Sequence, residues 1–193
     1  MNTNTQSDSK SNISQGNTKA LALIGVMAAV TCVMGPLSIP LPFSPVPISL
    51  TNLAVYFSVY ILGMKKGSIS YIIYLLIGFV GLPVFSSFTG GPGKLLGPTG
   101  GYLIGFLFMA VICGVFIDKW PDNIYLGFLG MVIGTLVMYV FGTVWLAYQA
   151  GLSLQNALIA GVIPFIPGDL AKIVIAMLIG PRITKRLKKA GLN

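Results

Sequence analysis

Long apolar runs alternate with short polar or Gly- and Pro-rich segments along almost the whole chain after residue 17. A helix that crosses a bilayer needs roughly 20 mostly apolar residues, because each residue adds about 1.5 Å to its length. Strands of a membrane barrel are shorter and alternate apolar with polar positions, which these runs do not do. We therefore predict an all-α polytopic membrane protein with six transmembrane helices, over residues 18–35, 48–63, 68–81, 100–117, 124–148 and 167–184.

Residues 1–17 differ in character from the rest of the chain. They are polar, contain few hydrophobic residues and have no helical or strand periodicity. Such segments bury too little apolar surface to offset the entropy of ordering the chain. We therefore predict a disordered cytoplasmic tail over residues 1–17, followed by a single membrane domain over residues 18–193.

The composition agrees with a membrane protein. Hydrophobic residues make up 55% of the chain and charged residues 8%, whereas soluble domains carry about 25% charged residues. The net charge of +8 raises the question of nucleic-acid binding. The Lys and Arg residues instead flank the apolar runs, which is the arrangement that orients membrane proteins. We therefore expect contact with the lipid bilayer and no nucleic-acid partner.

The distribution of basic residues also predicts the orientation in the cell membrane. With the N-terminus in the cytoplasm, every Lys and Arg except Lys94 and Lys172 lies in the tail or at the inner side of the six predicted helices. Positive charge favours the cytoplasmic side, so both termini are expected in the cytoplasm. Three long connections then face outward, over residues 36–49, 81–101 and 150–165.

The Gly-rich connection between the third and fourth predicted helices is long and nearly uncharged. The third predicted helix is short for a membrane crossing, which suggests that this connection dips into the protein. Irregular backbone at that depth has to line a cavity. Its glycines allow backbone N–H groups to approach a ligand, and Pro92 and Pro98 stiffen the chain. We predict a lid over a pocket; the alternative is a flexible connector.

Asp169 and Lys172 are charged residues within an apolar run. If Arg182 marks the cytoplasmic interface, the helical rise places Lys172 roughly 15 Å and Asp169 roughly 20 Å above it, within a hydrocarbon core about 30 Å thick. A charge at this depth costs on the order of 2.5–3.5 kcal/mol and usually faces an interior or a cavity. The pair is therefore a candidate binding site. Two structural alternatives are an i, i+3 salt bridge and support of a helix N-terminus by Asp169.

The chain lacks the residues that most catalytic sites need. It has no histidine and no glutamate, and its four acidic residues are all aspartates, of which only Asp169 lies within an apolar run. The segment "GGPGK" at Gly90–Lys94 does not have the spacing of a phosphate-binding loop, and Leu95 follows where Ser or Thr is required. We therefore predict no enzymatic activity, no metal, no cofactor and no ATP site. A transporter of this kind has to take its energy from a partner.

Several ordered motifs resemble one family of membrane proteins, the BioY family. They are "VPISL" (46–50), "GLPVF" (81–85), "GG" (90–91), "LLGPTGGYLIGF" (95–106) and "PFIPGDLAK" (164–172). The resemblance implies a biotin-binding S component of an energy-coupling factor (ECF) transporter. Such a protein has six helices, captures biotin from outside, and docks on a transmembrane coupling protein with two ATPase subunits.

The resemblance also implies roles for particular residues. The Asp169 carboxylate suits the ureido N–H groups of biotin, and the Lys172 ammonium suits its carbonyl oxygen. The other predicted ligand-binding residues are Asn52, Phe85, Gly90, Gly91, Thr99 and Tyr102. Phe43, Trp145, Tyr148 and Phe165 are further aromatic candidates for the apolar wall of the site, with an interfacial belt or core packing as the alternative.

Residues 48–53 depart from the sequence pattern of the family. Where the family commonly reads "ITLQTL", this chain reads "ISLTNL" over 48–53, with Thr51 in place of the glutamine and Asn52 after it. Asn52 therefore supplies an amide one position later. Its alternative role is a hydrogen bond between helices.

Ala22, Gly25 and Ala29 form a stripe of small residues on one face of the first predicted helix. Such a stripe permits close approach of another helix. S components present a similar surface to their coupling protein, so we expect partner binding here; the alternative is packing within this chain.

Three alternatives for the overall function are an S component for another vitamin, a stand-alone secondary transporter or channel, and, least favoured, an intramembrane enzyme.

Overall fold

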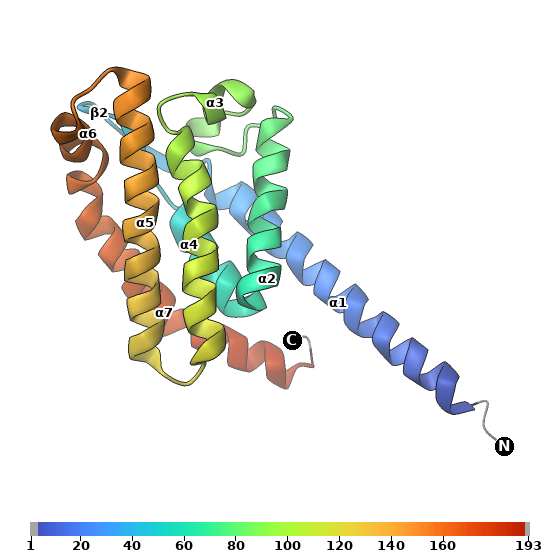
Figure 1. The fold of residues 1–193 in the computed structure, drawn as a ribbon. Coiled ribbons are helices and arrows are strands. Elements are labelled where there is room, and N and C mark those ends of the chain that lie inside the picture. The colour runs from blue at the N-terminus through green and yellow to red at the C-terminus, as the bar shows by residue number, and fades with distance from the viewer. Residues whose placement is uncertain (1–3, 192–193) are drawn as a thin grey trace.

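The computed structural model describes the backbone of residues 4–191 and the side chains of residues 17–191. In Figure 1, the three longest upright segments belong to α2, α4 and α5, α7 crosses behind them, and α1 runs diagonally away from the bundle. The helices are α1 (Asn4–Met34), α2 (Thr51–Phe79), α3 (Pro92–Leu96), α4 (Gly100–Lys119), α5 (Ile124–Ala150), α6 (Leu154–Gly161) and α7 (Ile166–Lys189). Two short 3-10 helices are η1 (Ser86–Phe88) and η2 (Ile163–Phe165).

Five helical segments within the described part of the chain are long and apolar enough to cross a membrane. They cover Asn17–Met34, Thr51–Phe79, Gly100–Lys119, Ile124–Ala150 and Leu154–Lys189. The prediction of a mostly helical, multi-pass membrane protein is therefore confirmed at this level. The second and third predicted helices, over residues 48–63 and 68–81, overlap the two parts of one segment, α2 (Thr51–Phe79).

The helix α2 contains a break at Gly63, which has φ 75° and ψ 178°. Glycine adopts this left-handed region without the steric cost that a Cβ atom would add. The chain folds back on itself here, because a Cβ added to Gly67 would lie 3.1 Å from Cα of Val59. Asp118 at the end of α4 accepts a hydrogen bond from the Met64 N–H at 2.8 Å and satisfies a backbone donor that follows the break.

The connection before α2 forms a β-hairpin, so the expectation of an all-α chain is wrong here. Strands β1 (Ser38–Leu41) and β2 (Ser44–Ser49) pair antiparallel, with Ser38 opposite Ser49. Prolines recur through this segment and exclude a helix, because each lacks a backbone N–H and its ring blocks the preceding turn. A two-stranded ribbon tolerates them, since both of its strands are edge strands.

The N-terminal segment also differs from the prediction. The helix α1 begins at Asn4, so the backbone is helical through residues 4–17, where we expected a disordered tail. Adding residues to an existing helix costs much less than nucleating a new one, which allows a polar extension of the apolar span. Residues 1–3 of the predicted tail lie outside the described residues.

Glycines bring α4 close to its neighbour α5. A Cβ added to Gly105 would lie 3.0 Å from the Met138 carbonyl oxygen, and one added to Gly134 would lie 2.8 Å from the Cys113 sulfur. Small residues at such positions allow helices in a membrane to pack with their backbones in close approach. The close packing of α4 on α5 fixes one wall of the cavity described below.

The two ends of the bundle have different structures. In Figure 1, β2, α3 and α6 gather at the upper end, while the α4–α5 connection and the C-terminus lie towards the lower end. The upper end therefore carries all three connections that we predicted to face outward. It is also the end that holds the cavity.

Candidate ligand-binding site

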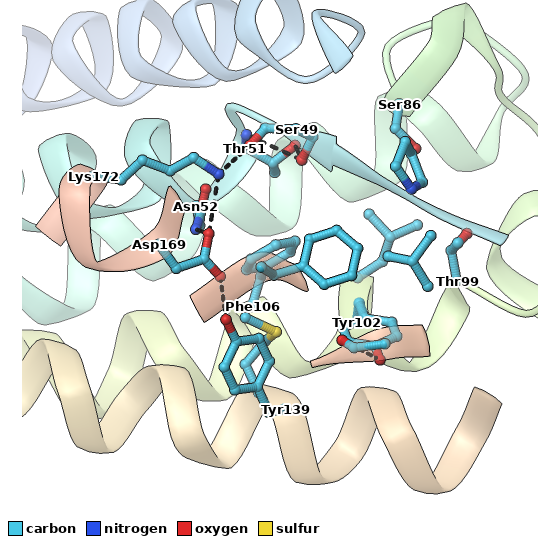
Figure 2. A pocket seen from close by; sticks show the side chains of 16 residues that line it. Ser49, Thr51, Asn52, Ser86, Thr99, Tyr102, Phe106, Tyr139, Asp169 and Lys172 are labelled. Carbon is cyan, nitrogen blue, oxygen red and sulfur yellow. Dashed lines mark hydrogen bonds and ion pairs between the residues drawn. The ribbon is translucent and has the colours of Figure 1, made fainter. Parts of the chain in front are cut away.

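A cavity of about 60 Å3 lies among β2, α2, α4, α5, α7 and the segments that connect them. Figure 2 shows that its lining changes in character from one end to the other. Asn52, Tyr139, Asp169 and Lys172 lie at one end, and Ser86 and Thr99 lie at the other. The rest of the lining is mainly apolar and includes Val46, Leu103, Phe106, Met138 and Phe165.

The Asp169 carboxylate is the centre of the polar end. Its Oδ1 accepts a hydrogen bond from the Asn52 amide at 2.8 Å and an ion-paired one from the Lys172 ammonium at 3.0 Å. Its Oδ2 accepts one from the Tyr139 hydroxyl at 2.6 Å. Lys172 also donates to the Ser49 carbonyl oxygen at 2.6 Å. Three segments that are distant in sequence, around residues 52, 139 and 169–172, therefore meet at one carboxylate (Figure 2).

The i, i+3 salt bridge considered from the sequence is present, and its two members also line the cavity. Asp169 and Lys172 are buried, with 6% and 8% of their surfaces exposed. Burying an ion pair often costs more than the pair returns unless further hydrogen bonds satisfy both charges. Asn52 and Tyr139 donate to the Asp169 carboxylate, and the Ser49 carbonyl oxygen accepts from Lys172. These bonds stabilise both charges in the buried site.

The local sequence explains the position of Asp169. It lies in the first turn of α7, which starts with a proline near its N-terminus. Proline is favoured there because the first helical N–H groups have no partner within the helix, and a negative charge in the first turn is stabilised by the helix dipole. Asp169 therefore supports the N-terminus of α7 and also lines the cavity.

The Gly-rich connection supplies the opposite end of the cavity. Ser86 lies in η1 and Thr99 directly precedes α4. The connection is held to α5 by two hydrogen bonds, from Trp145 Nε1 to the Gly97 carbonyl oxygen at 2.9 Å and from Gln149 Nε2 to the Leu96 carbonyl oxygen at 2.7 Å. These bonds make the connection an ordered wall, in agreement with the interpretation that it is more than a linker.

Tyr102 lines the cavity from α4 and is tightly fixed. Its hydroxyl donates to the Gly161 carbonyl oxygen at 2.9 Å, which ties α4 to the end of α6. Its ring occupies the space beside Gly142, where an added Cβ would collide with it. The predicted residues Asn52, Thr99, Tyr102, Asp169 and Lys172 are thus brought together around one cavity.

Three predicted ligand-binding residues, all within the described part of the chain, lie outside the cavity lining. Phe85 is fully buried and packs edge-on against Tyr74, with ring centroids 5.5 Å apart. Gly90 lies so close to the Leu82 carbonyl oxygen that an added Cβ would collide with it. Gly91 has φ 86° and is the N-cap residue that precedes α3. The physical reason is that the loop folds on its own backbone and on α2 in this region, so these residues shape the loop.

The other aromatic candidates are divided by the structure. Phe165 lines the cavity. Trp145 holds the Gly-rich connection, as described above. Phe43 and Tyr148 are exposed, with 65% and 82% of their surfaces accessible. Their positions agree with the alternative of an interfacial location.

Sequence reasoning missed several parts of the site: Tyr139 and the Ser49 carbonyl oxygen at the polar end, and Ser86 and Phe106 elsewhere in the lining. Tyr139 lies in a long apolar helix, where an aromatic residue is most often a packing residue. A backbone carbonyl has no sequence signature at all. A usable signal did exist for Tyr139, because a buried tyrosine hydroxyl normally requires a hydrogen-bond partner, and Asp169 was the only acidic residue available within the apolar runs.

In the described part of the chain, neither Lys94 nor a cluster of metal ligands lines the cavity. Lys94, a described residue, lies in α3 outside the cavity lining, and its partial burial lowers the pKa of its ammonium group. Within the described residues, no three His, Cys, Asp or Glu side chains are grouped to hold a metal ion. The groups that line the cavity offer hydrogen bonding and charge.

The small-residue stripe of α1 faces away from the bundle. Ala22, Gly25 and Ala29 are exposed, and a Cβ added to Gly25 would have no atom within 4 Å. The opposite face of α1, which includes Ile24 and Met27, is buried. Packing within this chain thus uses the other face, and the stripe is accessible.

Fold and site together define a multi-pass helical membrane protein with a partly open cavity at one end of the bundle, and the lining of this cavity is polar at one end and mainly apolar elsewhere. Residues 3–189 match the model of the BioY family, and the chain belongs to this family. It is 37% identical over 167 residues to the Biotin transporter BioY of Thermotoga maritima, covering 86% of this chain and 96% of that one. It is 36% identical over 165 residues to the Probable biotin transporter BioY of Pyrococcus horikoshii, with the same two coverages.

A solved structure has the same fold. The crystal structure of the S-component for biotin from an ECF-type ABC transporter superposes with a TM-score of 0.82 and 33% sequence identity. The match covers 88% of this chain and 92% of that one. The recognition of the family from sequence motifs is confirmed.

Proposed function

We propose that this chain is the biotin-specific S component of an ECF-type ABC transporter: it binds biotin and takes part in its transport, and it is not an enzyme. The observation that carries the proposal is the polar end of the cavity. It combines one carboxylate with an ammonium and an amide, all buried and all facing the cavity. A cyclic urea needs an acceptor for N–H and a donor for C=O, and this set supplies both.

The lining also suggests how biotin lies in the site. Its ureido ring would contact Asp169, Lys172 and Asn52. Its sulfur-containing ring and pentanoate chain would occupy the apolar middle beside Phe106 and Tyr102. Its carboxylate would reach the hydroxyls of Ser86 and Thr99. The site thus offers a separate environment for each chemical part of the ligand.

We infer that the Gly-rich connection acts as a lid. The cavity of about 60 Å3 is smaller than the roughly 300 Å3 at the lower limit of usual small-molecule sites. To admit a ligand as large as biotin, the walls of the cavity therefore have to move apart. Residues 96 and 97 of the connection are tied to α5 by two side-chain hydrogen bonds, and no residue of α3 is buried. This part of the connection therefore opens at lower cost than the packed helices.

We propose six membrane-crossing helices in one membrane domain over residues 18–193, with the two arms of α2 on either side of Gly63 counted separately. The break supports this division, because it lets residues 51–62 and 64–79 cross in opposite directions. Both termini would lie in the cytoplasm of the cell. The basic residues near Gly63 and in the C-terminal part of α7 favour that side of the membrane.

The energy for transport would come from partners. We propose that α1 docks on the transmembrane coupling protein of an ECF module that carries two ATPase subunits, with Ala22, Gly25 and Ala29 in the contact. Their exposure supports this assignment. Small residues on a membrane-facing helix allow the close helix contact that such docking requires.

Purification of the chain from cells, followed by mass spectrometry of the vitamin that co-purifies and calorimetric titration with biotin, tests the proposed function. We expect bound biotin and saturable one-site binding. Thiamine and riboflavin serve as controls and should give no heat of binding. Co-purification of a different vitamin would replace biotin as the substrate, and biotin uptake by vesicles that contain this chain without ATPase partners would favour a stand-alone transporter.

A further inference from the structure

The protein already uses most of the hydrogen-bonding capacity of the Asp169 carboxylate. An ionised carboxylate has about four acceptor positions, two on each oxygen. Asn52 and Lys172 both donate to Oδ1, at 2.8 and 3.0 Å, and so fill that oxygen. Tyr139 donates to Oδ2 at 2.6 Å and fills half of the other. One acceptor position on Oδ2 is therefore left for a ligand.

The donors at this end can be counted in the same way. The Lys172 ammonium has three N–H donors, of which the Ser49 carbonyl oxygen and Asp169 take two. The Asn52 amide nitrogen has two, of which Asp169 takes one. Each residue keeps one donor for a ligand. The polar end thus offers one charged acceptor and two donors.

Tyr139 separates the ligand cavity from a second space. An apolar crevice of about 190 Å3 lies between α5 and α7, and Tyr139 and Asp169 line both this crevice and the cavity. Leu136 and Leu170 on the crevice side are exposed, as expected for surfaces that face lipid. The Tyr139 ring therefore forms a wall, and its hydroxyl fixes the carboxylate. The two contributions can be separated by a change to phenylalanine, which keeps the ring.

Resting on the proposed function, we infer that Tyr139 is a positioning residue that sets the selectivity of the site. By occupying one position on Oδ2, it restricts Asp169 to a single ligand N–H. A neutral urea, which also presents a carbonyl oxygen to Lys172 and Asn52, fits this arrangement. A guanidinium-like ring, which replaces the carbonyl with further N–H donors and adds a positive charge, does not.

Titration of the purified full chain with biotin and with 2-iminobiotin, whose protonated ring is such a cation, tests the inference. In Tyr139→Phe, the affinity for biotin is expected to fall about tenfold, because Asp169 loses the hydrogen bond that holds its carboxylate in one orientation before the ligand binds. The affinity for 2-iminobiotin is expected to fall less, since the freed position on Oδ2 accepts an additional N–H. The ratio of the two affinities should therefore shift at least about threefold towards 2-iminobiotin.

Tyr56→Phe is the matched control. It removes a buried tyrosine hydroxyl that bonds to Thr135 at 2.6 Å, not to Asp169, and it should leave the ratio unchanged. An equal fall for both ligands in Tyr139→Phe, or no fall, would overturn the inference. A wild-type chain that binds no biotin would overturn the proposed function and this inference together, whereas wild-type binding with an unchanged ratio in the variant overturns the inference alone.

A second measurement applies if Tyr139→Phe does not fold. Site-specific incorporation of 3-fluorotyrosine at position 139 keeps the hydroxyl and gives a fluorine resonance beside Asp169. This resonance should shift when biotin is added, and the same label at position 56 should shift much less. A resonance at position 139 that does not respond to biotin would remove Tyr139 from the site.

Discussion

Asn52 and Asp169 are 117 residues apart in the chain, yet the Asn52 amide nitrogen lies 2.8 Å from Oδ1 of Asp169. The contact joins the first turn of α2 to the first turn of α7. Asn52 is 3% exposed and lines the cavity. It therefore combines the two roles considered from the sequence, because it bonds between helices and also faces the space where a ligand would lie.

The Asn52–Asp169 pair should behave as one unit in binding. Asn52→Ala and Asp169→Asn should each lower the affinity for biotin, but the double variant should lose less than the sum, because the shared hydrogen bond is removed only once. We expect a coupling free energy of about 1–2 kcal/mol. Calorimetric titration of the four chains measures it, and strictly additive losses would contradict the shared role.

Asp169 and Lys172 should be the most sensitive positions in the cavity. Asp169→Asn keeps the shape and removes the charged acceptor, and Lys172→Met removes the donor for the carbonyl oxygen. Each bond to a charged group contributes about 1.5–3 kcal/mol, so we expect biotin affinity to fall about ten- to a hundredfold. Lys185→Met, a change at an exposed residue in the last part of α7, is the control.

Thermal melts without ligand separate a binding role from a purely structural salt bridge. If the pair only stabilises the fold, each single change leaves a buried charge unpaired and lowers Tm, and the double Asn/Met variant restores both Tm and binding. We expect instead that the double variant does not recover biotin binding. Wild-type affinity in either single variant would remove that residue from the site.

The hydropathy pattern predicted most of the helical architecture, because the thickness of the hydrocarbon core fixes how long an apolar helix must be. Asp169 and Lys172 could be singled out for the same reason, since a charge within an apolar run is costly. The β-hairpin was missed because residues 36–49, with their prolines, were predicted only as a connection between helices. They also fit edge strands, and Val46 and Ile48 alternate with other residues along β2.

The contacts within the site could be predicted only in part. Asn52, Thr99 and Tyr102 were predicted as ligand-binding residues, and they line the cavity; their contact with a ligand stays a prediction. Phe85 and the pair Gly90 and Gly91 were chosen because they lie in matching motifs, but a motif does not say whether a residue contacts a ligand or shapes the loop that does. That distinction depends on backbone packing against Leu82 and Gly78, which the sequence does not encode locally.

The hydrogen bond from Trp145 to the Gly97 carbonyl oxygen should control the movement of the lid. Trp145→Phe removes this donor and keeps an aromatic ring against the Gly-rich connection. A net hydrogen bond is worth about 0.5–1.5 kcal/mol, so the rates of biotin association and dissociation should both rise about two- to tenfold. Kinetics with radiolabelled biotin measure these rates. Trp120→Phe, in the short connection between α4 and α5, should leave them unchanged.

Spin labels at Ser87 and Lys94 examine the same movement directly. Both residues lie in the connection, and Ser87 is exposed. We expect the mobility of both labels to fall when biotin is added, because the connection then packs on a bound ligand. Mobility that does not change with biotin would contradict the lid and would favour a flexible or fixed connector.

Gly142 should be required for the position of Tyr102. A Cβ at position 142 would collide with the Tyr102 ring, and overpacking of this kind costs about 1–3 kcal/mol. Gly142→Ala should therefore lower both Tm and biotin affinity, the latter about tenfold. Gly93→Ala is the control, because an added Cβ there has no atom within 4 Å. Normal binding by Gly142→Ala would show that the Tyr102 ring is free to adjust.

Changes on α1 should separate docking from ligand binding. Ile24, Met27 and Ala28 are buried against the rest of the chain, whereas Gly25 and Ala29 lie on the opposite, exposed face. A Trp side chain at either exposed position therefore fits without disturbing the bundle, but it blocks close approach of a second helix. Gly25→Trp and Ala29→Trp should abolish co-purification with the coupling protein and ATPases and leave biotin affinity unchanged.

Val140→Trp is the control for these variants. It adds the same bulk on α5, where the native side chain is 62% exposed, and it should leave assembly intact. Loss of assembly and biotin binding together in the α1 variants would instead indicate that this face packs within the chain.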